Sequence, residues 1–146
     1  MNSQDDAVWP LYIDHSFSLY GEEFDAVWVS SNGFITMYDP SADSTIQDAG
    51  GVYLPDPVGD DRWSYMLAPL WADLRDDNTN NASGVYYQTD AASSTFYWHD
   101  LTEDDSYATQ NNNYTSTGDT NDFALVIYAD NSFDFLYDEI NFVTQG

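Results

Sequence analysis

The stretch "VWVSSNGFITMY", residues 27–38, places a run of strand-forming residues on either side of Ser31-Asn32-Gly33. Asn-Gly is the dipeptide that best tolerates the two positive-φ positions of a tight hairpin turn, so we expect a hairpin here. Aromatic residues make up 17% of the chain, which favours sheets built around large rings over helices built around leucine and alanine. The stretch therefore predicts a fold made of ring-rich hairpins.

Strand-like runs separated by polar turns recur along the rest of the chain. They cover residues 17–20, 24–30, 34–38, 65–67, 84–88, 95–101, 123–129 and 133–140. The run 24–29 lacks polar alternation, so we expect it to be central in a sheet and covered on both faces. The only helix that we expect is a short turn near residues 64–67.

The pattern is clearest in "DFALVIYADNSFDFLYDE", residues 122–139, where Asp130-Asn131 predicts a second tight turn. Alternate apolar residues before the turn predict one buried face. Aromatic residues after the turn alternate with aspartates, which predicts a strand with one solvent-exposed face. The residues concerned are Phe123, Leu125 and Ile127 before the turn, and Phe133, Asp134, Phe135, Tyr137 and Asp138 after it. We expect an all-β, antiparallel, sandwich-like single domain over residues 1–146, with long acidic loops and little helix.

The charge balance is extreme, with 26 acidic residues against two arginines, Arg62 and Arg75, and a net charge of −24. Binding to nucleic acid or to an anionic membrane surface requires clustered basic residues, so both partners are excluded. No run approaches ~18 apolar residues, which argues against membrane insertion. Two explanations of the acidity stay open: a saline, halophilic habitat that screens the repulsion, or divalent cations bound among the carboxylates.

Two longer segments resemble the NIDO domain, the nidogen-like extracellular domain: "LYGEEFDAVWVSSNGFITM" at 19–37 and "MLAPLWADLRDDNTNNASGVYYQ" at 66–88. The shared order is Tyr-Gly, a strand, Ser-Asn-Gly-Phe, Ala-Pro-x-Trp-Ala-Asp and Gly-Val-Tyr-Tyr. The resemblance implies a noncatalytic, extracellular adhesion or interaction module of a cell-surface or matrix protein. Two departures stand out. Arg75 follows the Trp-Ala-Asp segment where the family tends to carry acidic residues, and the sequence stops at Gly146, so we expect a final strand to be absent or supplied by a neighbouring module or chain.

The best candidate for Ca²⁺ is the loop that follows the Trp-Ala-Asp segment. Alternate carboxylate and amide side chains can turn oxygens toward one hard cation, as in the first positions of a calcium loop. The residues are Asp73, Asp76, Asp77, Asn78 and Asn80. Asn81 stands where an EF-hand has its glycine and Tyr87 where it has its glutamate, so the loop is not an EF-hand. The alternative is a solvated turn without metal.

Other clusters favour structural interpretations. Asp56, Asp60 and Asp61 stand beside Arg62 in what we interpret as a solvated loop with a surface ion pair, and we interpret Asp104-Asp105 and the stretch from Asp119 to Asp122 in the same way. His15 and His99 are the only histidines, and a zinc site would need the fold to join both of them to a carboxylate. One surface histidine and one strand histidine is the interpretation that the sequence favours.

Three functions from different classes stay open beside the interaction module. Paired carboxylates hydrolyse glycosides, and the four glutamates Glu22, Glu23, Glu103 and Glu139 leave a hydrolase as a minor alternative to a domain that is no enzyme. Aromatic residues beside calcium could bind a glycan; the candidates are Tyr86, Tyr87, Trp98, Tyr107 and Tyr114. An open sheet edge could also permit self-association into a surface filament or layer. The expected partner is a protein or a glycan on a cell surface or matrix.

Overall fold

The protein is described by a computed structural model that covers residues 7–40, 65–75, 83–103 and 120–141. Strands make up 68% of these residues. The strands are β1 (Val8–Leu19), β2 (Glu22–Ser30), β3 (Phe34–Thr36), β4 (Met66–Leu67), β5 (Leu74–Arg75), β6 (Gly84–Thr89), β7 (Ser93–Glu103), β8 (Asn121–Tyr128) and β9 (Phe133–Glu139). The predicted all-β class is confirmed, because the described residues form no α-helix.

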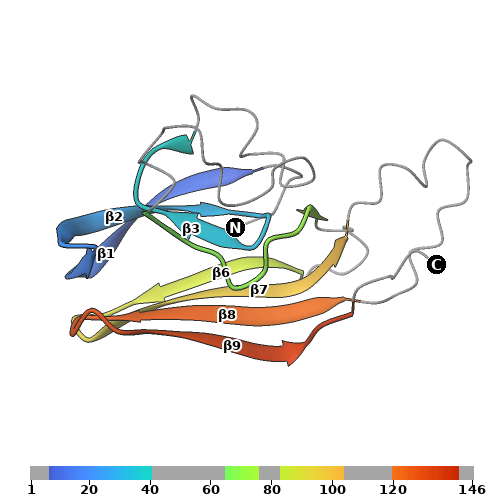
Figure 1. The fold of residues 1–146 in the computed structure, drawn as a ribbon. Helices are drawn as coiled ribbons and strands as arrows, with labels where there is room; N and C mark the ends of the chain where they lie inside the picture. The colour runs from blue at the N-terminus through green and yellow to red at the C-terminus, as the bar shows by residue number, and fades with distance from the viewer. Residues whose placement is uncertain (1–6, 41–64, 76–82, 104–119, 142–146) are drawn as a thin grey trace, which may run out of the picture.

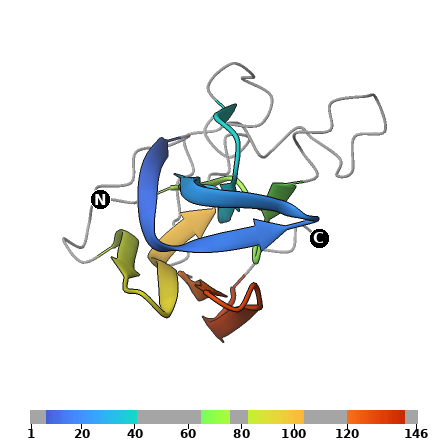
Figure 2. The same ribbon diagram turned by 90° about the vertical axis from the view of Figure 1, so that its left-hand side faces the viewer.

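Two antiparallel sheets pack face to face, which confirms the predicted sandwich (Figure 1). The first sheet has the order β1-β2-β3-β4. The second has the order β5-β7-β8-β9, and β6 pairs with the same strand, β7, as β5 does. Figure 2 turns the molecule and places β9, in dark red, at the bottom, on the side away from the blue strands of the first sheet. The second sheet is thus the wider one, and β9 is its outermost strand.

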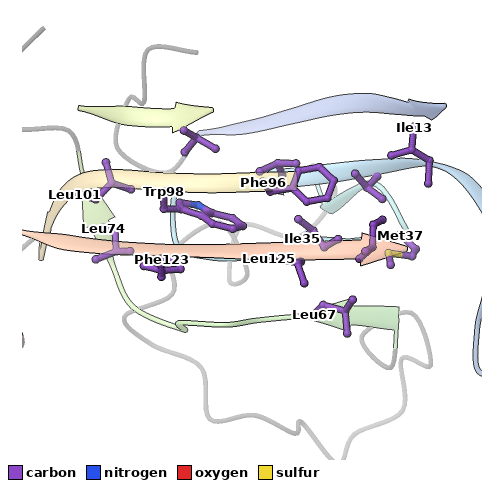
Figure 3. Packing of buried hydrophobic residues seen from close by; sticks show 14 of the residues in the cluster. Ile13, Ile35, Met37, Leu67, Leu74, Phe96, Trp98, Leu101, Phe123 and Leu125 are labelled. Carbon is purple, nitrogen blue, oxygen red and sulfur yellow. The ribbon is translucent and has the colours of Figure 1, made fainter. Parts of the chain in front are cut away.

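The core between the sheets is built from the alternate residues that each strand directs inward. Val27 and Val29 of β2 belong to one buried cluster with Phe96 and Trp98 of β7 and Leu125 of β8, and all five are fully buried. Figure 3 shows Phe96, Trp98 and Leu125 within this cluster. The indole of Trp98 stacks on Phe123 with ring centroids 5.1 Å apart. Large rings fill the core, as the aromatic content predicts.

One hydrogen bond links the two sheets through the middle of this core. The indole Nε1 of Trp98, on β7, donates to the backbone oxygen of Ser30, the last residue of β2, at 2.8 Å. Both groups are buried, so each satisfies the other where no water reaches. The bond fixes the position of the first hairpin over the second sheet.

The hairpin at Ser31-Asn32-Gly33 forms, but its turn differs from the predicted one. Three residues connect Ser30 to Phe34, and only Gly33 has a positive φ, of 78°. A three-residue turn with glycine in the left-handed position is the next commonest hairpin connection after the two-residue turn. The turn is also buried, because the chain near Leu70 crosses directly over it.

Several strand predictions need correction. β1 begins at Val8, although the pattern predicts a strand only from Phe17. Pro10 and the polar run Asp14-His15-Ser16 interrupt the strand pattern in the first half, and an edge strand tolerates a proline. β2 is central, as predicted, but its two faces are covered unequally, since Val27 and Val29 are buried while Ala26 and Trp28, which alternate with them, are only half-buried. Residues 66–67 form β4, which confirms the predicted run at 65–67, so the helical turn that we also expected there is wrong for these two residues. β5 has no counterpart among the predicted runs.

The predicted turn at Asp130-Asn131 is confirmed, with Asn131 at a φ of 69°. Phe123, Leu125 and Ile127 share a buried face, also as predicted. The strand after the turn differs from the prediction of one solvent-exposed face. All seven residues of β9 are exposed, so both of its faces are open to solvent. The physical reason is position, because β9 is the last strand of the second sheet and lies on the side away from the strands of the first (Figure 2).

Candidate functional site

Two features of the second sheet stand out: the open edge at β9 and a cluster of polar residues at the junction of β7 and β8. We call the second feature the His99 cluster, and it consists of Tyr97, His99, Asp100 and Asp122. The sequence predicted an open sheet edge without placing it on β9, and it offered His99 only as part of a site shared with His15. They lie on neighbouring strands, because β9 pairs with β8 and β8 pairs with β7.

The exposed aromatic residues of β9 belong to the inner face of the sheet. Phe133 pairs with Ile127, Phe135 with Leu125 and Tyr137 with Phe123, and each of those partners is buried in the core. Residues directly opposite each other in an antiparallel pair point to the same face. The inner face therefore continues past the core as a row of rings whose exposed fractions are 42%, 37% and 52%.

The outer side of β9 carries its charge. Asp134, Leu136 and Asp138 alternate with the aromatic residues, and Leu136 is 51% exposed. The hydroxyl of Tyr128 donates to Asp134 at 3.0 Å, which holds that carboxylate beside the strand. Within the described residues, β9 pairs with β8 alone, and its second edge has no strand beside it.

The His99 cluster forms where the ladder between β7 and β8 is interrupted. The register shifts between Trp98 and Leu101, so His99 and Asp100 occupy a β-bulge. Asp100 has a φ of 52°, a left-handed conformation that aspartate tolerates better than most residues. Bulges re-aim side chains, and this one brings Asp100 next to the ring of its neighbour, His99.

Asp122 is the centre of the hydrogen bonding in the cluster. Its Oδ1 lies 2.5 Å from His99 Nδ1 and 2.7 Å from the hydroxyl of Tyr97, and it also accepts from the backbone N–H of Asp100. Burial opposes ionisation of this carboxyl, but the bonds from His99 and Tyr97 outweigh it and lower the pKa of Asp122. Asp122 is therefore an anion that organises the other three residues.

The rings beside the carboxylate are fixed by packing. The Tyr97 ring stacks on the imidazole of His99 with centroids 5.3 Å apart and planes 24° apart, and Tyr86 lies 6.2 Å from the same imidazole. Burial, followed by the bond to Asp122, raises the pKa of Tyr97, so its hydroxyl stays protonated and donates. The imidazole thus has a defined orientation.

The described residues contain one group of at least three histidine, cysteine, aspartate or glutamate side chains that lie close enough together to hold a metal ion. It consists of His99, Asp100 and Asp122. The sequence analysis missed this group, although two signals were present. Tyr97 and His99 are alternate residues of one strand and therefore lie on the same face, and Asp100 directly follows His99. The interpretation of Asp122 as part of a solvated stretch is wrong, because Asp122 is a buried residue of β8 and the pairing of β8 with β7 brings it to His99.

The predicted calcium loop is mostly outside the described residues, which include Asp73 but not Asp76, Asp77, Asn78 or Asn80. Asp73 is half-buried and directly precedes β5. The cluster near Asp56 and the pair near Asp104 also lie outside the described residues. Calcium binding at residues 73–80 stays a prediction.

His15 and His99 do not form a joint site in the described part of the chain. His15 lies on β1, with Nε2 3.1 Å from the Ser94 hydroxyl and Nδ1 3.1 Å from the backbone oxygen of Ser16. The group that surrounds His99 contains no second histidine. A zinc site that uses both histidines finds no support in this arrangement.

Of the candidates for glycan stacking, Trp98 is fully buried and belongs to the core, whereas Tyr86 is 43% exposed. Tyr87 is half-buried and donates its hydroxyl to the backbone oxygen of Tyr12. Tyr107 and Tyr114 lie outside the described residues. Three glutamates have separate local partners: Glu22 accepts from Tyr38, Glu23 from Ser16, and Glu139 from Asn141.

The fold is an all-β sandwich whose second sheet ends, within the described residues, in the exposed strand β9. The chain belongs to the NIDO-related family, which matches it over residues 1–146, its whole length. Domains of this family are typically extracellular and generally non-catalytic. No curated protein and no solved structure matches the chain. No helix in the described residues has the length and apolar character needed to cross a membrane.

Proposed function

We propose that this domain is a noncatalytic extracellular interaction module that binds a partner protein by strand addition at β9. The observation that carries the proposal is the exposure of all seven residues of Phe133–Glu139 at the outer edge of the second sheet. A strand at a sheet edge presents unpaired N–H and C=O groups, and an extended peptide can pair with them. Membership of a family of extracellular, generally non-catalytic domains supports the same function.

The two faces of β9 specify the chemistry of the partner strand. Its inner face offers the rings of Phe133, Phe135 and Tyr137, and these would pack against apolar side chains. Its outer face offers Asp134 and Asp138, which would pair with basic side chains directly opposite. The partner that fits is an extended segment in which apolar and basic residues alternate.

Charge complementarity favours such a segment over a second copy of this chain. Each chain carries a net charge of −24, so two copies repel each other, and edge-to-edge pairing would place aspartates of β9 near those of its symmetry mate. A basic partner gains from the same charge, since long-range attraction raises the rate of association. Self-association through β9 is therefore an outcome to be tested, not the proposed one.

The test uses a nine-residue synthetic peptide that alternates valine and lysine, added to the ¹⁵N-labelled protein. We expect chemical-shift changes concentrated in β9 and slower hydrogen exchange of its amides, because the peptide would cover them. A matched peptide with glutamate in place of lysine should bind at least about tenfold more weakly through like-charge repulsion. A third peptide with proline at alternate positions cannot donate to the edge and should not protect it.

Three results would contradict the proposal. Equal binding of the lysine and glutamate peptides would remove the electrostatic argument. Shift changes confined to strands other than β9 would place binding elsewhere. Sedimentation that shows dimers whose formation is abolished by Leu136→Lys would assign the edge to a second copy of the chain instead.

A further inference from the structure

We propose that His99 and Asp100 form a binding site for a divalent transition-metal ion such as Zn²⁺, with the imidazole Nε2 of His99 and the carboxylate of Asp100 as its protein ligands. The site is separate from the β9 edge and does not depend on the proposed function. It also differs from the predicted calcium loop and from a site shared by His15 and His99.

The hydrogen bonds determine which imidazole nitrogen is available. The Oδ1 of Asp122 lies 2.5 Å from His99 Nδ1, and a carboxylate oxygen accepts hydrogen bonds, so the proton between the two groups belongs to Nδ1. In the neutral imidazole, Nε2 then carries the lone pair, which is the form that binds metal ions. A carboxylate that holds the other ring nitrogen of a metal-binding histidine in this way is the usual arrangement in metal sites.

The separation between Nε2 and Asp100 suits two ligands of one ion. His99 Nε2 lies 3.6 Å from Asp100 Oδ2. Two ligands that are each ~2.1 Å from a tetrahedral Zn²⁺ lie about 3.4 Å apart, so an ion can bridge these atoms with little movement. Asp122 is too close for the same role, because 2.5 Å between its Oδ1 and Nδ1 leaves no room for an ion between them.

The surroundings hold the two ligands in place and leave them open to solvent. The stacked Tyr97 ring and the carboxylate of Asp122, which is only 9% exposed, fix the imidazole. The bulge fixes Asp100, and the side chains of His99 and Asp100 remain 31% and 26% exposed. Water or a group from a partner can therefore complete the coordination.

The donor set selects the class of metal. An imidazole nitrogen favours Zn²⁺, Ni²⁺ or Cu²⁺, whereas Ca²⁺ and Mg²⁺ prefer oxygen ligands throughout. Asp138 lies near enough to act electrostatically on Tyr97, so three carboxylates, those of Asp100, Asp122 and Asp138, give the cluster a negative potential that attracts cations. An excess of Ca²⁺ should thus occupy exposed carboxylates without blocking the site.

The experiment titrates Zn²⁺ into metal-stripped, ¹⁵N-labelled protein in a large excess of Ca²⁺ and follows the imidazole nitrogens of both histidines by NMR. We expect the Nε2 signal of His99 to move and to saturate, while the signals of His15 stay in place. Because this measurement uses the unmodified chain, it does not depend on whether a variant folds.

Four variants then assign the ligands. His99→Gln and Asp100→Asn should each weaken Zn²⁺ binding about tenfold or more, and Asp122→Asn should weaken it about 10- to 100-fold through loss of orientation. His15→Gln is the matched control and should leave the affinity unchanged. Circular dichroism at the titration temperature establishes that each variant is folded.

Either of two results would overturn the site. An Nε2 signal of His99 that does not respond to Zn²⁺ in the presence of Ca²⁺ would show that the cluster binds no ion. Equal losses in His15→Gln and His99→Gln would show that Zn²⁺ only joins the diffuse cation atmosphere of an acidic protein.

Discussion

The hairpins β2–β3 and β8–β9 are built from the same residue types, but their turns lie in opposite environments. Each joins ring-rich strands through a turn that contains asparagine. The first turn is buried, with Asn32 fully inaccessible, and the second is exposed, with Asn131 at the surface. The difference arises from the neighbours of each turn, because the backbone near Leu70 lies directly against the first, whereas the second stays exposed although Asn131 accepts from the N–H of Ser18. Local sequence makes a hairpin, whereas its neighbours decide whether it becomes core or surface.

The buried hairpin should fail most severely when a methyl group is added to its turn. A Cβ at Gly33 would lie 1.9 Å from the backbone oxygen of Leu70, and its φ of 78° is strained for any other residue. We expect Gly33→Ala to lower the free energy of unfolding by about 4 kcal/mol, the sum of backbone strain and steric overlap. Urea denaturation followed by tryptophan fluorescence measures this change.

Gly21 provides the matched control for that substitution. It has a similar φ of 89°, but a Cβ there would meet no atom within 4 Å. Gly21→Ala should therefore cost only the strain, about 1 kcal/mol. Equal losses at the two glycines would mean that the crossing of Leu70 over the turn contributes nothing.

The two asparagines allow the second comparison between the hairpins. Asn32 Oδ1 accepts the buried N–H of Leu74 at 2.8 Å, so it ties the first turn to β5. Asn32→Ala would leave that N–H without its partner at a cost of about 2 kcal/mol. Asn131 Oδ1 accepts the N–H of Ser18 at 2.7 Å in an exposed setting, where water can replace it.

We therefore expect Asn131→Ala to cost about 1 kcal/mol, most of it from the left-handed backbone that alanine tolerates less well. Chemical denaturation of Asn32→Ala and Asn131→Ala at equal protein concentration gives the two losses in the free energy of unfolding. A larger loss at Asn131 than at Asn32 would show that the exposed turn, not the buried one, anchors the fold.

These contrasts show how far the sequence could predict the structure. The alternation of apolar and polar residues and the positions of turn-forming residues are local properties of the sequence. They therefore predicted the all-β class, both hairpins and the buried face of β8. They could not predict that Asn32 is buried or that Phe135 is exposed, since both depend on the packing of distant segments. The same limit applies to the sites: His99 and Asp100 adjoin in sequence, but Asp122 reaches them only through the pairing of β7 with β8.

The exposed hairpin should separate binding from stability. Phe135 is 37% exposed and lies at the margin of the core, so Phe135→Ala should lower the free energy of unfolding by only about 1 kcal/mol. The same change removes the central ring of the proposed docking face, and we expect the valine-lysine peptide to bind about tenfold more weakly. Peptide titrations and thermal melts of one preparation measure the two effects.

Phe96, which is fully buried on β7, is the control for that separation. Phe96→Ala should cost about 4 kcal/mol, and the fraction that remains folded should bind the peptide normally. The proposed role of β9 would be wrong if Phe135→Ala lost as much stability as Phe96→Ala and kept its affinity for the peptide.

The smallest expected effect concerns the turn of the exposed hairpin at low pH. The hydroxyl of Ser132 donates to Asp130 at 2.5 Å and its backbone N–H at 3.0 Å, and these bonds lower the pKa of Asp130 below its usual value of 3.8. A depressed pKa in the folded state stabilises the protein above that usual value, and the contribution disappears as the pH falls through the folded pKa. Asp130→Asn should therefore reduce stability slightly at about pH 6, and the difference should shrink as the pH falls through the folded pKa of Asp130.

Comparison with Ser132→Ala isolates this bond from the general repulsion among 26 acidic residues, which protonation relieves in every variant alike. Ser132→Ala removes the hydroxyl but keeps the backbone N–H, so the pKa of Asp130 should rise part of the way toward its usual value. A carboxyl ¹³C titration of both proteins reads this pKa directly. If the midpoint of Asp130 is the same with and without the hydroxyl, then Ser132 does not organise the turn, and the exposed hairpin depends on its strands alone.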